Sequence, residues 1–240
     1  NFYLGNNGQV IVRPQQVATA SDTCSILNWF IDGQSAQTYD CNDVGAPIQV
    51  LIRVEDPSGN AAQCNAIINI LDTITPVANC LNVTVALDSF GIATVCGSDL
   101  AFGSIDNCSI IDTLVNGQNC ITFTCDSVTA PMMPRLVNVQ VVDASNNIAS
   151  CVSEVTVIDN IAPTLVCNDT VIVQLNAAGI AIISPNQLIS SVTDACTPIT
   201  LSVDKDSFDC TNRTSGALVI VTAVDVNGQS NTCNSTVLAE

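Results

Sequence analysis

Cysteine is the residue type in this sequence that is best placed to do chemistry. The 240 residues include 13 cysteines and no histidine. Zinc sites usually combine cysteine with histidine or use closely spaced Cys-x-x-Cys pairs, and the sequence contains neither pattern. Disulfide bonds formed in an oxidising compartment are the simpler use of so many cysteines. We therefore expect a secreted protein, extracellular or at the cell surface.

Side chains suited to catalysis are scarce. Without histidine no Ser-His-Asp or Cys-His arrangement can form, and Lys205 is the only lysine. The aspartates occur mainly at repeated turn positions, where such a side chain usually hydrogen-bonds its own backbone. A carboxylate pair in a cleft stays open as an alternative. We expect no enzymatic activity and no cofactor.

The net charge limits the possible partners. Asp and Glu number 22 against 5 Lys and Arg, so the formal net charge is −17. Such a surface repels nucleic acid, because affinity for nucleic acid depends on Lys and Arg neutralising phosphates. No run of 18 apolar residues occurs, so this segment should not insert into a membrane. The acidity indicates either the solubility of a secreted surface or cation binding, and we prefer the first.

The cysteines belong to a repeating set of landmarks, and this repeat decides the predicted fold. Each copy has an Asp eight residues before a Cys, an Asp-x-Cys motif, and a third cysteine after that motif. In this order the landmarks are Asp56/Cys64, Asp143/Cys151 and Asp225/Cys233; Asp22/Cys24, Asp106/Cys108 and Asp194/Cys196; and Cys41, Cys125 and Cys210. The copies are predicted to run over residues 1–72, 73–159 and 160–240. The first copy lacks its opening segment, which indicates a window from a longer periodic chain or, alternatively, a copy completed by a neighbour's strand.

Short β-branched segments separated by turns fill each copy. In the second copy residues 83–87 and 92–95 read as strands joined by a tight turn, in which Gly91 can adopt a positive φ. Late in each copy comes a β-branched run, such as 218–224 in the third copy. A turn and a closing strand follow such a run, and 152–158 is the closing strand of the second copy. About seven short strands in roughly 85 residues are typical of an immunoglobulin-like sandwich. The predicted fold class is all-β: tandem immunoglobulin-like β-sandwich repeats, stapled by disulfides.

Strand order suggests how the cysteines pair. In such sandwiches the first strand often runs parallel beside the last, so cysteines just before these two strands should meet. Within each copy, the Asp-x-Cys cysteine and the third cysteine would close a shorter loop, and the two extra cysteines of the second copy pair by elimination. The expected bonds are Cys80–Cys151, Cys167–Cys233, Cys24–Cys41, Cys108–Cys125, Cys196–Cys210 and Cys96–Cys120. Cys64 is left over, with its partner in the missing opening segment or in a neighbour. Each bond should add about 2–4 kcal/mol of stability.

Calcium is the metal that the acidic residues could bind. Carboxylates at the copy junctions and at the repeated turns are hard oxygen ligands. The candidates are Asp56, Asp72, Asp143, Asp159 and Asp225. No segment has the dense Asp-x-Asp-x-Asp spacing of a dedicated calcium loop, so we expect these residues to be turn formers and commit to no metal site.

The landmarks resemble the hyalin-repeat (HYR-like) modules of long repetitive surface adhesins, including the gliding adhesins of Bacteroidetes. The residues that carry this resemblance are the Asp-x-x-x-Pro junctions at Asp72 and Asp159, Asp106-Asn107-Cys108, Phe208-Asp209-Cys210 and the turn at Asp225. The resemblance covers the whole chain, although the second copy departs from it by an insertion and an extra cysteine pair. It implies an immunoglobulin-like sandwich that serves in adhesion or in extracellular fibres.

Several residues are candidates for glycosylation. Asn-x-Ser/Thr signals place possible N-linked sugars at Asn82, Asn168, Asn212 and Asn234. The resemblance to Bacteroidetes adhesins adds an O-glycan signature, Asp-Ser/Thr followed by an aliphatic residue, at Thr73, Thr113, Ser127 and Thr170. We expect at least one of these O-linked sites to be used.

Three functions fit this sequence. We prefer a structural or adhesive segment of a long extracellular filament or cell-surface adhesin. The alternatives are a glycan- or protein-binding module that acts through its end loops, and a subunit that assembles with copies of itself into a fibre. The expected partners are therefore copies of the chain or other surface components, with glycans as partners in the binding-module alternative.

Overall fold

The protein is described by a computed structural model covering residues 1–128, 133–213 and 215–240. Within these residues the regular structure is almost entirely β-strand, with a few short helical turns. The chain divides into two compact units. Unit 1 comprises Asn1–Asn82, Cys96–Cys120 and Val137–Ser153, and unit 2 comprises Val83–Val95, Ile121–Leu136 and Glu154–Glu240. In the described part of the chain, no helix has the length and apolar character needed to cross a membrane.

Unit 1 contains the strands of the N-terminal repeat and part of the middle one. Its elements are β1 (Phe2–Tyr3), β2 (Gln9–Val12), α1 (Pro14–Val17), β3 (Asn28–Ile31), β4 (Gln37–Asp40), η1 (Cys41–Asp43), β5 (Ile48–Glu55), β6 (Ala61–Ile68), β7 (Ile70–Leu71), α2 (Gly97–Leu100) and β10 (Ile110–Val115). The sheet β3-β5-β6 is antiparallel, β2 pairs antiparallel with β4, and β1 runs parallel to β7.

Unit 2 contains the C-terminal repeat and the remaining part of the middle one. Its elements are β8 (Val83–Ala86), η2 (Cys125–Ser127), β14 (Thr164–Cys167), β15 (Thr170–Val173), β16 (Ile180–Ile182), η3 (Pro185–Gln187), β17 (Ile189–Thr193), β18 (Thr200–Val203), β19 (Ser207–Asp209), η4 (Cys210–Asn212), β20 (Ala217–Val224) and β21 (Ser230–Ala239). Four further strands contribute residues to both units: β9 (Ile92–Cys96), β11 (Cys120–Thr124), β12 (Arg135–Asp143) and β13 (Ile148–Ile158).

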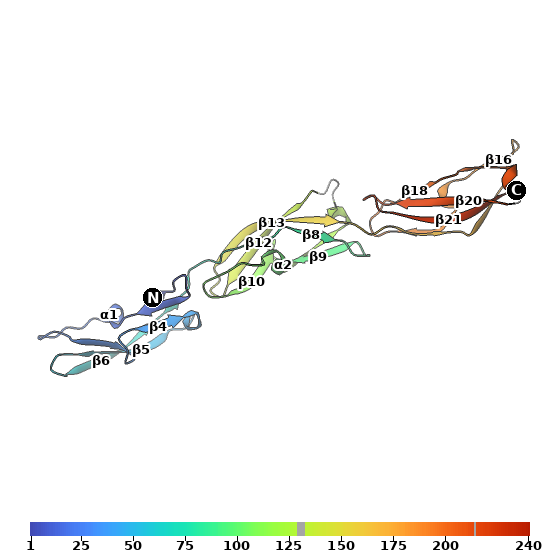
Figure 1. The fold of residues 1–240 in the computed structure, drawn as a ribbon. Helices are drawn as coiled ribbons and strands as arrows, with labels where there is room; N and C mark the ends of the chain where they lie inside the picture. Colours follow the sequence, from blue (N-terminus) through green and yellow to red (C-terminus); the bar gives the residue numbers. More distant parts are fainter. Residues whose placement is uncertain (129–132, 214) are drawn as a thin grey trace. The chain divides into compact units, whose positions relative to one another are not determined.

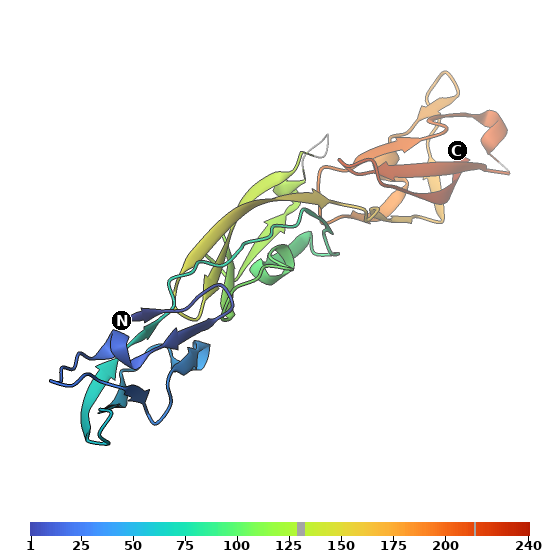
Figure 2. The ribbon, with the colours of Figure 1, turned by 60° about the vertical axis from the view of Figure 1, so that its left-hand side comes forward.

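The C-terminal repeat shows the sandwich most completely. One sheet has the order β15-β21-β20-β18, and the shorter pairs β14-β17 and β16-β19 complete the repeat. The hairpin of β20 and β21, orange-red in colour, can be followed in Figure 1 and again in the turned view of Figure 2. Alternate residues of β20 point inward, because successive side chains of a strand face opposite sides of the sheet. Val219, Val221 and Ala223 are therefore buried, and they pack with Phe208 and Leu188 in the core.

Unit 1 has a separate apolar core in the N-terminal repeat. Strand β5 alternates in the same way, burying Val50 and Ile52 and exposing Gln49, Leu51 and Arg53. The buried members of this core are Leu4, Val12, Ile31, Tyr39, Val50, Ile52, Ile68 and Ile70. Cys41 and Cys108 are partly buried and pack against this core. Cys108 belongs to the middle repeat, so the contact joins that repeat to the core of the N-terminal one.

In each repeat the strand that leads into the glycine turn runs parallel to the last strand, which is the parallel pairing that the sequence predicted. β1 pairs with β7, β8 with the end of β13, and β15 with β21. The predicted tight turn before β9 is also confirmed, since the Gly91 N–H donates to the Asp88 carbonyl at 2.9 Å and Gly91 has a φ of +73°. The fold is a tandem array of disulfide-stapled immunoglobulin-like β-sandwiches, which is the predicted fold class.

Candidate functional site

The disulfide bonds form two kinds of link. The described residues contain the bonds Cys41–Cys108, Cys80–Cys151, Cys96–Cys120, Cys125–Cys196 and Cys167–Cys233. The bonds Cys80–Cys151, Cys167–Cys233 and Cys96–Cys120 are ones that the strand order and elimination led us to expect. The other two are different: each joins the third cysteine of one repeat to the Asp-x-Cys cysteine of the next. We call these two places the junctions.

The three inner pairs expected from the sequence are wrong. The structure does not join Cys24 to Cys41, Cys108 to Cys125 or Cys196 to Cys210, and it leaves Cys24, Cys64 and Cys210 as exposed free thiols. The reason lies in where the two motifs sit within a repeat.

The C-terminal repeat shows this separation. Cys196 lies near the turn that begins at Asp225 and precedes β21, because both approach Asp159. The Cys196 sulfur lies within 4.8 Å of an Asp159 carboxylate oxygen, and Asn227 of that turn donates to Asp159 Oδ2 at 3.1 Å. Cys210 lies beside the turn of Gly179, which follows β15 and is next to the far end of β21. A ten-residue strand is about 30 Å long, whereas a disulfide needs Cα atoms within about 7 Å. The two cysteines of one repeat therefore lie at opposite ends of it.

A glycine turn makes room for each junction disulfide. At the first junction, Gly8 has a φ of +70°, and a Cβ on it would lie 2.5 Å from the Asn107 carbonyl oxygen and 3.0 Å from the Cys41 sulfur. At the second, a Cβ on Gly91 would lie 2.8 Å from the Cys125 sulfur and 3.3 Å from the Ala195 side chain. The repeated glycine is thus required both by its backbone conformation and by the close approach of the next repeat.

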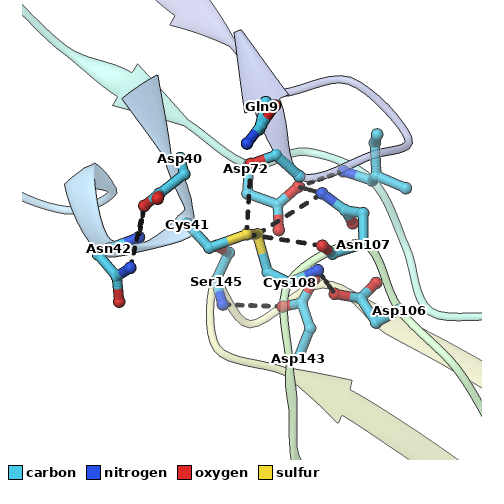
Figure 3. The surroundings of a disulfide bond; sticks show 12 residues. Gln9, Asp40, Cys41, Asn42, Asp72, Asp106, Asn107, Cys108, Asp143 and Ser145 are labelled. Carbon is cyan, nitrogen blue, oxygen red and sulfur yellow. Dashed lines mark hydrogen bonds between the residues drawn. A yellow bond between two sulfur atoms is a disulfide. The ribbon is translucent and has the colours of Figure 1, made fainter. Parts of the chain in front are cut away.

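Three aspartates surround the first junction disulfide. Carboxylate oxygens of Asp72, Asp106 and Asp143 lie within 4.8 Å of one another, and Figure 3 shows them around the Cys41–Cys108 bond. Asp72 is 6% exposed and Asp143 is fully buried. Negative charges brought this close repel one another unless a positive charge lies between them.

Hydrogen bonds hold one oxygen of Asp72 and of Asp106, and both oxygens of Asp143. Asp72 Oδ1 accepts from the Ile74 N–H at 3.2 Å and from Asn107 Nδ2 at 3.1 Å. Asp106 Oδ2 accepts from the Cys108 N–H at 2.9 Å. Asp143 Oδ1 accepts backbone N–H groups of the turn that it begins. Among the described buried atoms, Asp72 Oδ2, Asp106 Oδ1 and Asn107 Oδ1 have no hydrogen-bond partner.

The second junction repeats the arrangement in part: Asp159 and Asp194 lie close together, and Asn227 donates to Asp159 Oδ2 with its side chain and to Asp225 Oδ1 with its N–H. Carboxylate oxygens of Asp159 and Asp194 lie within 4.8 Å of each other and of the Cys196 sulfur. Burial raises the pKa of Asp194; the Cys196 N–H bond opposes this shift, and the charges of Asp159 and Asp225 add to it. Asp225 Oδ1 accepts from the Asn227 and Gln229 N–H groups at 2.8 Å, and its buried Oδ2 has no hydrogen-bond partner among the described residues.

The calcium candidates from the sequence divide into two groups. The structure brings Asp72 together with Asp143, and it places Asp159 and Asp225 around Asp194. Asp56 belongs to neither cluster. Sequence reasoning missed Asp106 and Asp194, although the Asp-x-Cys motif that recurs in each repeat was the signal that could have pointed to them.

Asp56 behaves as the turn former that the sequence predicted. It accepts the Asn60 N–H at 2.8 Å and Asn60 Nδ2 at 2.7 Å. These hydrogen bonds, the Asn60 side chain first, lower the pKa of Asp56. Asp143 makes the same bonds with Asn147, so the turn itself is common to both positions and the acid cluster is an addition at the junction.

The glycosylation candidates fall in different surroundings. Thr73, Thr170, Asn82 and Asn234 are exposed, whereas Thr113, Ser127, Asn168 and Asn212 are half-buried. The Asn168 amide already donates to the carbonyls of Gln187 and Ile189. All eight sites stay predictions.

The chain matches no known protein family and no curated protein. Among solved structures, it is similar to the insect immune protein hemolin (10% identity, 97% of this chain and 68% of that one, TM-score 0.36). It is also similar to immunoglobulin domains 1–4 of Sidekick-1 (8% identity, 100% and 73%, TM-score 0.36) and to titin domains I67–I69 (12% identity, 100% and 94%, TM-score 0.36). Likenesses this weak assign neither a family nor a function.

Proposed function

We propose that the chain is a structural and adhesive segment of an extracellular filament or cell-surface adhesin, without enzymatic activity. In this proposal residues 1–72, 73–159 and 160–240 are successive repeats of one array. The observation that carries it is the pair of junction disulfides, Cys41–Cys108 and Cys125–Cys196, which continue the covalent link from each repeat to the next. Five disulfides in one chain also favour an oxidising, extracellular location.

The junction disulfides provide a direct path for mechanical load. Without them, tension would pass from one repeat to the next only through the linking peptide, and it would unravel the strands on either side. With them, tension at Cys41 passes to Cys108 across a Cα–Cα distance of 5.5 Å, and tension at Cys125 passes to Cys196 across 5.3 Å. Most of the chain therefore lies outside the loaded path, as a load-bearing spacer requires.

Force spectroscopy on the full chain tests this proposal. Because an extended residue spans at most about 3.3–3.6 Å, the oxidised chain should reach less than about half of the length that it reaches after reduction with dithiothreitol. The double variant Cys41→Ser/Cys108→Ser should recover part of the lost length without reductant. The matched control is Cys96→Ser/Cys120→Ser, which removes a disulfide that does not cross a junction and should leave the oxidised length unchanged. Equal lengths before and after reduction would overturn the proposal.

A second candidate function is self-assembly, and the free cysteines favour it. Cys210 lies next to the Gly179 turn, as Cys41 and Cys125 lie next to theirs. Asp22 accepts the Cys24 N–H at 2.9 Å, which is the contact that Asp106 and Asp194 make in the bridged Asp-x-Cys loops. Cys210 of one molecule thus has the surroundings of the third cysteine in a junction disulfide. Cys24 of another molecule has the surroundings of the Asp-x-Cys cysteine that would pair with it.

Oxidation with a low-molecular-weight disulfide tests the self-assembly. Oxidised glutathione would take two electrons from the Cys210 and Cys24 thiols, which form one disulfide, while glutathione leaves as two thiols. Peptide mapping should find Cys24 joined to Cys210 between molecules, and Cys64→Ser should not change the products. If Cys24–Cys24 and Cys210–Cys210 dimers form as readily, the linkage is random oxidation and self-assembly through this site is refuted.

A further inference from the structure

We propose that each junction binds one calcium ion through its clustered aspartates. The first site consists of Asp72, Asp106 and Asp143. The second consists of Asp159 and Asp194 at the same spacing, with Asp225 linked to Asp159 through hydrogen bonds of Asn227. Each site lies beside a junction disulfide, so the ion would join the peptide between two repeats to the Asp-x-Cys loop and the Asp turn of the second repeat.

The spacing of the oxygens fits one shared cation. Calcium binds oxygen ligands at about 2.3–2.6 Å, so two oxygens on the same ion lie at most about 5 Å apart. The ligand atoms of Asp72, Asp106 and Asp143 all lie within 4.8 Å of one another, as do those of Asp159 and Asp194. Three acidic side chains at this distance, two of them buried, form a site for positive charge.

The unpartnered oxygens are the observation that points to a ligand. Asp72 is more than nine-tenths buried, and its Oδ1 accepts two hydrogen bonds while its Oδ2 accepts none. Asp106 and Asp225 show the same division, with one oxygen held by backbone N–H groups and the other buried without a partner in the described structure. A buried carboxylate oxygen is costly unless it is bonded, and a cation would satisfy it.

The chemistry of the ligands favours calcium among the common cations. Every candidate ligand at the first site is a hard carboxylate oxygen. The Cys196 sulfur near the second site is part of a disulfide and carries no thiolate charge. Magnesium demands a near-ideal octahedron and keeps several waters, whereas calcium accepts irregular sets of carboxylate and amide oxygens.

Calorimetry on the full, oxidised chain tests the inference. After treatment with a chelator, titration with calcium chloride should show two ions per chain. The dissociation constants should fall in the 10⁻⁴–10⁻³ M range of extracellular calcium modules or be smaller, which means tighter binding. The variants Asp106→Asn and Asp194→Asn should each abolish one of the two sites or weaken it at least about tenfold. We choose them because asparagine can still accept the N–H of Cys108 or Cys196, so the loop keeps its conformation.

A matched control separates metal binding from turn formation. Asp56→Asn alters the turn that corresponds to those of Asp143 and Asp225 but lies outside both clusters. This variant should bind two calcium ions with unchanged affinity. The melting temperature provides the second measurement. With chelator present, Asp106→Asn should melt at a temperature no lower than that of the parent chain. When calcium is added, its melting temperature should rise much less than that of the parent chain. No heat of binding and no calcium-dependent melting shift at about 10⁻³ M would overturn the inference, as would an Asp106→Asn variant that binds like the parent chain.

Discussion

A Cβ atom on Gly91 would lie 2.8 Å from the sulfur of Cys125, closer than real Cβ contacts come. The turn before β9 is therefore shaped around the disulfide that holds the next repeat. Gly179 occupies the corresponding turn of the C-terminal repeat with almost the same φ, +76°, but a Cβ there would meet the Cys210 sulfur at 3.6 Å, an ordinary contact. Both glycines adopt a positive φ, but only Gly91 has a disulfide sulfur so close that it leaves no room for a Cβ atom.

This pair yields the first prediction. Alanine at either position costs about 1–2 kcal/mol for its left-handed backbone conformation. Gly91→Ala should cost about 1–3 kcal/mol more, because the added methyl group crowds the junction. Denaturant unfolding of the two variants measures the difference, and equal losses would show that the junction adjusts freely around residue 91.

The disulfide map yields the second prediction. Peptide mapping without reduction should find Cys41 joined to Cys108 and Cys125 joined to Cys196. Removing one junction bond with Cys41→Ser/Cys108→Ser should lower the free energy of unfolding by about 2–4 kcal/mol, because the unfolded chain regains the freedom of a long loop. A peptide linking Cys108 to Cys125 would refute the arrangement.

Two buried serines at matching positions yield the third prediction. Ser153 and Ser235 each follow a repeat's last cysteine by two residues, and both are at most 1% exposed. The Ser153 hydroxyl donates to the Leu81 carbonyl, whereas the Ser235 hydroxyl has no partner among the described residues. Ser153→Ala should therefore cost about 0.5–1.5 kcal/mol, and Ser235→Ala should be neutral or stabilising. Thermal melting of both variants provides the comparison, and a loss in Ser235→Ala as large as that in Ser153→Ala would contradict it.

The turn at Asp56 yields a fourth prediction, which depends on pH. Hydrogen bonds from Asn60 lower the folded-state pKa of Asp56 below its ordinary value of 3.8. The folded state thus binds this proton less tightly than the unfolded state, so the stabilisation is present above pH 3.8 and is lost as the pH falls through the folded-state pKa. In Asn60→Ala, carboxyl NMR titration should show the pKa of Asp56 moving back toward 3.8. An unchanged pKa would assign the shift to another cause.

The parts of this structure that the sequence predicted are those that depend on local pattern. Strand β20 is recognisable because Val219, Val221 and Ala223 alternate with outward-facing residues, and the Gly91 turn follows from glycine chemistry. The Cys80–Cys151 bond follows from the parallel pairing of first and last strands.

The junctions were missed because their contacts join residues from different repeats. A pairing of Cys108 with Cys125 closes a short loop and looks favourable in sequence, but the sequence does not show that these motifs lie at opposite ends of a repeat. Asp106 was read only as a marker of the repeat because its buried partners are distant in sequence: Asp72, in the preceding repeat, is 34 residues away, and Asp143, in the same repeat, is 37 residues away.

The disulfide loops overlap along the chain. The loop closed by Cys41–Cys108 ends after the one closed by Cys80–Cys151 has begun, and the loops of Cys125–Cys196 and Cys167–Cys233 continue the sequence. Every peptide bond from residue 41 to residue 233 is therefore enclosed by at least one disulfide. A protease that cuts once anywhere in this stretch leaves both fragments attached, so the molecule can be nicked in a hostile medium and still hold together until it is reduced.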